Sequence, residues 1–188
     1  MKELLYGNRS MIACVICYLG WWIITFKPPA PKGTIMGSLF LIGAFIFGLG
    51  GIFVIVHAMI RLTEQDIVNS FVPMWSIPAA GIISYFLLLL ISAKLLHRQV
   101  TSELLIIIIW TILEVCFVGT MYRYGFTGKG SLIGLIIGII AVTVISMICY
   151  MLYYKLEYVK GYFDGMIPLI LTGIMMIVIN IVGQQGVR

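Results

Sequence analysis

Positions 132–154 read LIGLIIGIIAVTVISMICYMLYY, a run without one charged residue. About 20 mostly apolar residues in a helix cross the hydrocarbon core of a bilayer, which is roughly 30 Å thick. Because no water inside the bilayer can satisfy bare peptide groups, such a run must be helical. Other stretches of the chain have the same character. The predicted spans are Met11–Phe26, Thr34–Ile60, Val72–Leu96, Leu104–Met121, Leu132–Tyr154 and Gly165–Val182.

The composition agrees with a membrane protein that crosses the bilayer many times. Of the 188 residues, 62% are hydrophobic and 10% are charged. Six spans leave only short loops, which excludes a soluble catalytic domain. We therefore predict an all-α fold in which residues 1–188 form a single domain, a bundle of six transmembrane helices. The expected location is a prokaryotic cell membrane.

The net charge of +5 at pH 7 raises the question of a polyanionic partner. The basic residues are scattered singly at the ends of the spans, where Lys and Arg meet lipid headgroups. No basic block of the kind that binds nucleic acid is present. The lipid bilayer is therefore the expected partner, and nucleic acid is not. The 12 Lys and Arg residues divide equally between the two sides of the predicted topology, so the positive-inside rule assigns no orientation.

Glycines recur at helical spacing in two of the predicted spans. Gly130, Gly134 and Gly138 lie along one face of the fifth span, and the second span carries the pair Gly50-Gly51. Lipid tails are as apolar as leucine, so membrane helices associate where small residues let the backbones approach closely. This pattern predicts tight helix packing within or between subunits, and we expect a homo-oligomer.

The four cysteines, Cys14, Cys17, Cys116 and Cys149, all fall inside predicted spans. Cys14 and Cys17 share a helix face at i, i+3, a spacing that suits a redox pair. Quinone-linked thiol enzymes also need partner cysteines in loops, and this sequence has none there. Because buried cysteine behaves as a small apolar side chain, packing is the expected role, and redox chemistry is the alternative.

Polar side chains inside the spans are the candidate functional residues, because an ionisable group in the bilayer is costly. Glu114 lies well inside the fourth span, and His57 lies about one turn before Arg61 near the end of the second. At a rise of 1.5 Å per residue, Glu114 and His57 fall within about 6 Å of each other in depth. Asn180 and Ser76 fall in the same half of the membrane.

We interpret these residues as a polar vestibule that narrows toward Glu114. The expected solute path contains Glu114, His57, Asn180, Trp110 and Ser76. A buried carboxyl group beside a histidine, which changes charge near neutral pH, can gate a path or carry a proton. The alternative is structural, with Glu114 hydrogen-bonded to Thr111 or to a neighbouring helix and His57 extended toward the headgroups.

Asp164 directly precedes Gly165 at the predicted start of the last span. A carboxylate at the amino terminus of a helix accepts hydrogen bonds from unpaired N–H groups and faces the positive end of the helix dipole. We therefore predict that Asp164 caps this helix, with a gate in the solute path as the alternative.

The sequence carries no recognisable catalytic or cofactor motif. It has no Ser between glycines, no His-Glu-x-x-His pair and no phosphate-binding loop. The two histidines, His57 and His97, fall on opposite sides of the predicted topology, which argues against a metal site. We expect no enzyme activity, no cofactor and no bound metal.

Short motifs give the chain a resemblance to two families of six-helix small-solute channels. The Pro-Lys link before Thr34-Ile35-Met36, and Asp164-Gly165 at the last span, resemble the urea and short-chain amide channel family. Gly50-Gly51, and Trp110 followed by Gly119-Thr120, resemble the acetate uptake transporter family. Either resemblance implies a ring of subunits, each with its own pore through a six-helix bundle.

The sequence thus predicts an integral membrane channel or transporter for a small polar solute, with a path lined by Glu114. The candidate solutes are urea or an amide, a short carboxylate, or an ion. One alternative is the substrate-binding membrane subunit of a vitamin importer, although Met11–Phe26 lacks the Ala-x-x-x-Ala pattern that such subunits use for docking. Another alternative is a non-transporting structural subunit of a larger membrane complex.

Overall fold

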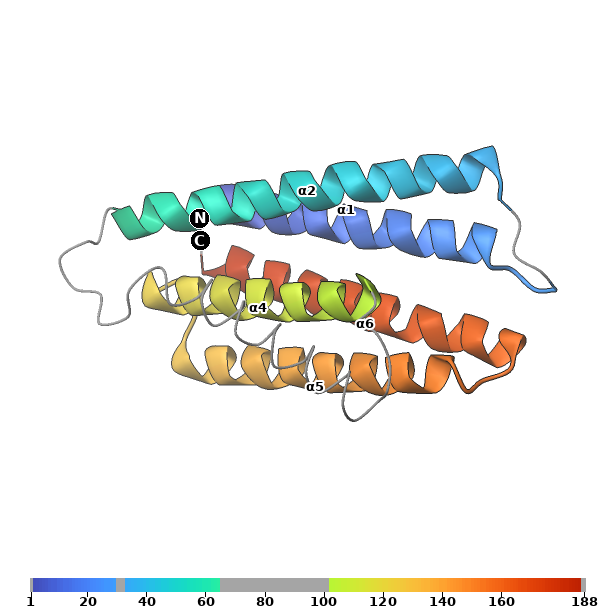
Figure 1. Ribbon diagram of the computed structural model, residues 1–188. Coiled ribbons are helices and arrows are strands. Elements are labelled where there is room, and N and C mark those ends of the chain that lie inside the picture. The colour runs from blue at the N-terminus through green and yellow to red at the C-terminus, as the bar shows by residue number, and fades with distance from the viewer. Residues whose placement is uncertain (1, 30–32, 65–101, 187–188) are drawn as a thin grey trace.

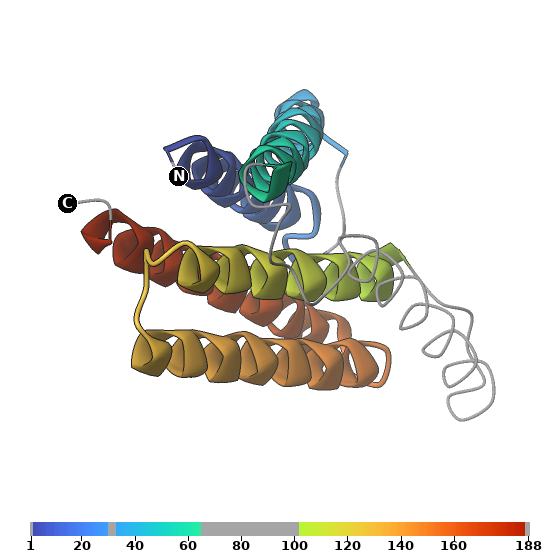
Figure 2. The same ribbon diagram turned by 90° about the vertical axis from the view of Figure 1, so that its left-hand side faces the viewer.

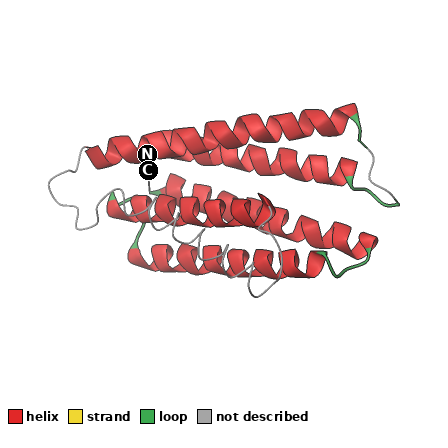
Figure 3. Cartoon of the chain, in the orientation of Figure 1, coloured by secondary structure: helices red, strands yellow, loops and turns green. Residues whose placement is uncertain are grey.

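The computed structural model describes residues 2–29, 33–64 and 102–186, and every regular element among them is a helix (Figures 1 and 3). The helices are α1 (Lys2–Thr25), α2 (Ile35–Glu64), α4 (Ser102–Arg123), α5 (Lys129–Tyr153) and α6 (Tyr158–Gln185). Each contains a segment long and apolar enough to cross a membrane. The described part of the chain is therefore an all-helical, multi-pass integral membrane protein. The third predicted span, Val72–Leu96, lies outside the described residues.

Helix α1 begins at Lys2 rather than near Met11, where its apolar run starts. One face of its first turns packs inside the bundle, where Leu4 and Leu5 belong to the core and Asn8 is fully buried. Charged neighbours in this segment lower its mean hydropathy, so a hydropathy window places the start of the helix too late.

Helix α6 also begins earlier than predicted, at Tyr158 rather than Gly165. Its first residue is held in place by a contact with the residue that follows α1, since the Tyr158 hydroxyl donates a hydrogen bond to the Phe26 carbonyl at 2.8 Å. Lys160 interrupts the apolar pattern here and forms an ion pair with Glu157, at 3.2 Å, in the first turn. The helix therefore extends through a charged segment at the end of the bundle.

The helices form two groups that lie side by side (Figures 1 and 2). One group is the antiparallel pair of α1 and α2, and the other contains α4, α5 and α6. Helix α1 packs on α2 and α6, and α5 packs on α4 and α6, so the neighbours follow in the order α2, α1, α6, α5, α4. Contact between α2 and α4 is slight. Both ends of the chain lie at the same end of the bundle (Figure 1).

The C-terminal ends of α2, α4 and α6 meet at the end of the bundle that holds the chain termini. The Tyr124 hydroxyl donates to the Leu62 carbonyl at 2.6 Å, which joins the ends of α4 and α2. A Cβ on Gly186 would overlap the backbone of Phe126, so the end of α6 lies against the loop after α4. Helices α2 and α4 therefore run in the same direction, as the second and fourth helices of the predicted six-span topology do.

Glycines bring α1 and α2 into backbone contact. A Cβ added to Gly51 would lie 3.1 Å from the carbonyl oxygen of Gly7, and one added to Gly7 would lie 3.1 Å from the carbonyl oxygen of Gly51. Such distances leave no room for a larger side chain at either position. In a bilayer, where burial alone does not press helices together, close packing of this kind stabilises a helix pair.

The cysteines of α1 pack on two other glycines of α2. A Cβ on Gly48 would lie 3.0 Å from the Cys14 sulfur, and one on Gly43 would lie 3.3 Å from the Cys17 sulfur. Each thiol therefore fills the space that a glycine leaves open, as the packing interpretation of these cysteines predicts.

The glycine row of α5 contributes less to packing than its spacing predicts. A Cβ on Gly138 would lie 3.0 Å from the side chain of Met175 in α6, so this glycine does serve the contact between α5 and α6. At Gly130 and Gly134 a Cβ would meet no described atom within 4 Å. A contact between subunits at these two glycines stays a prediction.

Two asparagine side chains join α1 to α6 by hydrogen bonds in the interior. The Asn8 amide donates to the carbonyl oxygen of Met176 at 3.0 Å, and the Asn180 amide donates to the carbonyl oxygen of Leu5 at 3.2 Å. The Asn180 side-chain oxygen accepts in turn from Gln184. Because water is absent from the bilayer core, these bonds fix how α1 and α6 are rotated toward each other.

The apolar core occupies the half of the bundle near the chain termini. Its fully buried side chains come from every described helix. They include Leu4, Ile55, Phe117, Val118, Met121, Ile139, Met176 and Ile179. The opposite half is less completely filled, and the candidate functional site lies there.

Candidate solute site

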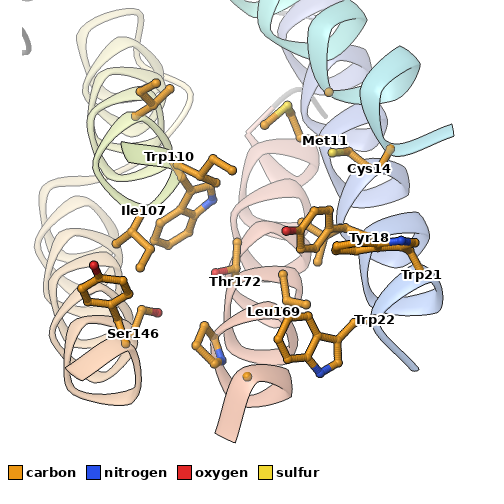
Figure 4. Close-up of a pocket in the computed structure, with 18 of the residues that line it drawn as sticks. Met11, Cys14, Tyr18, Trp21, Trp22, Ile107, Trp110, Ser146, Leu169 and Thr172 are labelled. Atoms are coloured by element: carbon orange, nitrogen blue, oxygen red, sulfur yellow. The ribbon is translucent and has the colours of Figure 1, made fainter. Parts of the chain in front are cut away.

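A cavity of about 620 Å³ lies between the helices in the half of the bundle away from the chain termini. Its walls come mainly from the C-terminal halves of α1 and α5 and from the N-terminal halves of α2, α4 and α6. Figure 4 shows side chains converging on it, with Tyr18 on α1, Trp110 on α4 and Thr172 on α6. A volume of this size suits an organic ligand, since ligand pockets occupy about 300–1,000 Å³.

Aromatic side chains form one wall of the cavity, at the ends of α1 and α5. The rings of Tyr18 and Trp21 lie 5.0 Å apart between centroids, and Trp22 stacks on Phe26 at 4.5 Å. Tyr153 of α5 approaches Trp22 edge-on at 5.9 Å. We refer to these five residues as the aromatic wall. Their contacts hold the rings in defined positions, as edge-to-face and offset arrangements do.

Trp22 is fixed to α6 by one hydrogen bond and one glycine. Its indole nitrogen donates to the carbonyl oxygen of Tyr162 at 3.1 Å. A Cβ on Gly165 would lie 2.9 Å from the ring carbon Cη2 of Trp22 and closer still to its neighbour. Gly165 is therefore the place where α6 must lack a side chain so that the indole ring can lie against its backbone.

Trp110 lines the cavity from α4 and carries an unused hydrogen-bond donor. Its side chain is only 6% exposed, and its indole N–H has no partner within the described part of the chain. A buried indole N–H usually finds an acceptor. The donor is therefore available to a ligand in the cavity.

Asp164 lines the cavity from α6 and is the second polar group there. Its side chain is 8% exposed, and the thiol of Cys149 lies beside its carboxyl group. One carboxyl oxygen, Oδ2, has no partner in the described residues. The predicted helix cap is wrong, because α6 begins at Tyr158 and Asp164 lies almost two turns inside it.

Glu114 lies one turn beyond Trp110 on the same face of α4, toward the core. The side chain is 1% exposed, and neither carboxyl oxygen has a hydrogen-bond partner in the described ranges. Trp110 and Leu113 line the cavity, whereas Phe117 and Val118 belong to the fully buried core. Glu114 is therefore placed where the cavity meets the core, although it does not itself line the cavity.

The structural alternative for Glu114, a hydrogen bond to Thr111, is not formed. The Thr111 hydroxyl is within 2.8 Å of the Ile107 carbonyl oxygen on its own helix and of the Thr143 hydroxyl on α5. Thr111 therefore serves the contact between α4 and α5, and the carboxyl group of Glu114 is left without a partner in the described residues.

The other predicted path residues do not gather around Glu114. His57 lies on the exposed face of α2 and stacks on Phe53 at 6.0 Å, so the expectation that it faces the buried Glu114 is wrong. Asn180 is buried and joins α6 to α1, as described above, and neither residue lines the cavity. Ser76 lies outside the described residues.

Sequence reasoning missed the aromatic wall and Asn8. Tryptophan and tyrosine at the ends of spans usually anchor a protein at the membrane surface, so the position of Trp22 in the sequence does not indicate that it turns inward. The nearby Gly165 is the one local signal, because an indole ring can lie against a helix only where a side chain is absent. Asn8 precedes the first apolar run, Met11–Phe26, so the sequence pattern does not indicate a role for it.

Among the described residues, no three His, Cys, Asp or Glu side chains come together in a way that could hold a metal ion. Comparison of the chain with models of protein families, with curated protein sequences and with solved structures finds no match. The class that the structure defines is a multi-pass helical membrane protein, with a cavity between its helices and the buried Glu114 beside it.

Proposed function

We propose that this protein is a membrane transport protein that binds an organic solute in the cavity and passes it along the bundle beside Glu114. The observation that carries the proposal is the position of Glu114 directly beyond a cavity-lining residue, buried and without a partner in the described chain. An ionisable group inside a membrane span is costly, and it commonly marks a path for a solute, an ion or a proton.

The volume of the cavity favours a solute larger than urea or acetate. A space of about 620 Å³ is in the range of sites for drug-sized ligands, and the residues that line it are mainly apolar. We therefore propose that the solute carries an apolar body and few polar groups. The channels that the sequence motifs resemble suggest transport, but the cavity suggests a different solute size.

Flux measurements in liposomes test the proposal. Uptake of labelled acetamide, benzoate and tetraethylammonium into liposomes with the purified protein is compared with uptake into empty liposomes. We expect uptake of at least one of the three to exceed the empty-liposome rate. Glu114→Gln should change that rate by at least about threefold, because it removes an ionisable group from the path.

The matched control is Glu157→Gln. Glu157 lies at the start of α6 with a largely exposed side chain, so this variant removes one carboxylate without touching the interior. Its flux should equal that of the unmodified protein. Uptake of all three solutes at the empty-liposome rate, or equal rates for Glu114→Gln and the unmodified protein, would contradict the proposal.

A cavity in one half of the bundle also suits the binding subunit of an importer, which must hold its substrate without passing it alone. The importer subunit differs from a self-sufficient transporter because it needs an ATPase as a partner. Stable co-purification with an ATPase, together with solute binding but no flux by the isolated chain, would favour the importer subunit over the self-sufficient transporter.

A further inference from the structure

We propose further that the cavity selects an organic cation, whose charge pairs with Asp164 and whose apolar body lies against the aromatic wall. This inference rests on the proposed function, because it names the class of solute for the same site. It is carried by three features of the cavity: its charge, its aromatic rings and its lack of ligands for inorganic ions.

Among the described residues that line the cavity, one carries its charge. Asp164 is the only Asp or Glu among the described residues that line it, and no Lys, Arg or His is among them. Lys160, which lies on α6 at the same end of the bundle, does not line the cavity and pairs with Glu157. A carboxylate among mainly apolar side chains attracts a cation and repels an anion.

The aromatic rings supply a second attraction for positive charge. The face of an aromatic ring is negative, and a cation within about 6 Å of its centroid is stabilised, most strongly by tryptophan. Tyr18, Trp21 and Trp22 line the cavity from α1, and Trp110 faces them from α4 (Figure 4). An ammonium or phosphonium group with apolar substituents meets both the rings and the carboxylate.

An inorganic cation finds too few ligands here. Hard cations such as Ca²⁺ need six or more oxygen atoms around them. The described lining offers one carboxyl group, at Asp164, and a few hydroxyl groups, such as those of Ser146 and Thr172, among mostly apolar side chains. An organic cation carries its own apolar shell and gives up little hydration, so it suits this lining better.

Two ions of the same shape and opposite charge provide the test. Tetraphenylphosphonium and tetraphenylborate have the same four-ring frame and differ in the sign of the charge. Binding of each to the purified protein in non-ionic detergent is measured by equilibrium dialysis, with binding to protein-free micelles subtracted. We expect saturable binding of tetraphenylphosphonium to one site per chain, and affinity at least about tenfold lower for tetraphenylborate.

Variants at the carboxylate separate a binding role from a structural one. Asp164→Asn should weaken tetraphenylphosphonium binding by at least about tenfold, because it removes the paired charge. Asp164→Glu returns the charge and should recover most of the affinity, which a purely structural role for Asp164 would not produce. Glu157→Gln removes an exposed charge from the same helix and should leave binding unchanged.

Equal binding of the two ions, or Asp164→Asn binding as tightly as the unmodified protein, would overturn the inference. Different results would contradict the transport proposal and the cation-site proposal. Flux of acetamide or benzoate without tetraphenylphosphonium binding would overturn the cation site and leave transport standing. Asp164-dependent tetraphenylphosphonium binding by a chain that shows no flux would support the cation site and contradict transport.

Discussion

At the scale of single residues, the two buried carboxyl groups differ in what surrounds them. Asp164 faces a cavity and has the thiol of Cys149 beside it, whereas Glu114 has no hydrogen-bond partner in the described chain. Burying a polar group without a partner costs free energy, and the cost is larger for a charge. A buried carboxyl group without a partner in the described residues is more readily explained by function than by packing.

The unpartnered carboxyl group of Glu114 predicts the effect of Glu114→Met on stability and on flux. Methionine has a similar size and needs no hydrogen-bond partner, so we expect the free energy of unfolding in detergent to rise by about 1–3 kcal/mol. Solute flux in liposomes should fall at the same time. Thermal unfolding and the uptake assay measure the two effects on one preparation.

A lower unfolding temperature for Glu114→Met would point to a structural hydrogen bond of the carboxyl group and contradict the argument. Thr111→Val serves as a comparison, since Thr111 does form a hydrogen bond across the contact between α4 and α5. Loss of this hydrogen bond should lower the free energy of unfolding by about 1 kcal/mol.

At the scale of elements, α1 is the helix that joins the two groups of helices, because it contacts both α2 and α6. It meets α2 through paired glycines and meets α6 through two asparagines and Trp22. Membrane helices gain little from apolar burial alone, so close backbone contact and hydrogen bonds must hold these elements together. The order α2, α1, α6 follows from these specific contacts.

Adjacent glycines of α2 provide a sharp test of the contact between α1 and α2. A Cβ on Gly51 would lie 2.9 Å from the Met11 side chain and 3.1 Å from the Gly7 carbonyl oxygen, whereas one on Gly50 would meet no described atom within 4 Å. We expect Gly51→Leu to lower the free energy of unfolding by about 1–3 kcal/mol through overpacking. Gly50→Leu should change it by less than about 0.5 kcal/mol.

Thermal unfolding of both variants in the same detergent measures the difference. The two substitutions are identical in chemistry and occupy neighbouring positions, so helix propensity affects both alike. Equal losses of stability would show that α1 and α2 do not approach each other at Gly51.

At the scale of the whole molecule, α2 and α4 run in the same direction and the two chain termini lie at one end of the bundle. A chain that crosses a membrane an even number of times has both termini on one side. With the described helices, an even number of crossings also requires that α2 and α4 run in the same direction. The structure describes five helices of sufficient length, and the predicted third span lies outside the described residues.

We therefore predict that the amino and carboxyl termini face the same side of the membrane. Reporter domains fused to either terminus, one active only in the cytoplasm and one active only outside it, measure this directly. The same reporter should be active at both ends. Activity of different reporters at the two ends would indicate an odd number of crossings and contradict the arrangement of the helices.

Much of the fold was predictable because the bilayer imposes a simple rule: uncharged segments of about 20 residues must be helical. The position of Glu114 well inside α4 also follows from counting residues along the predicted span, whereas that of Asp164 does not, because α6 begins at Tyr158 rather than at Gly165. The direction in which a side chain points does not, because it depends on how each helix is rotated by its neighbours. His57 and Asn180 are predicted to line a path in the half of the bundle near the chain termini, but the cavity lies in the opposite half. His57 lies on an exposed face, and Asn180 bonds to α1.

The sequence by itself determines the class of the protein and the five apolar helices that the structure describes, and it singles out Glu114 as a candidate functional residue. Tertiary structure alone decided which polar groups have partners, which aromatic rings turn inward, and that a cavity lies beside Trp110 and Asp164. The physical reason is that hydropathy is a property of each segment, whereas helix rotation and contact are set by pairs of helices. A glycine such as Gly165 has its effect only when the ring of Trp22 arrives from another helix.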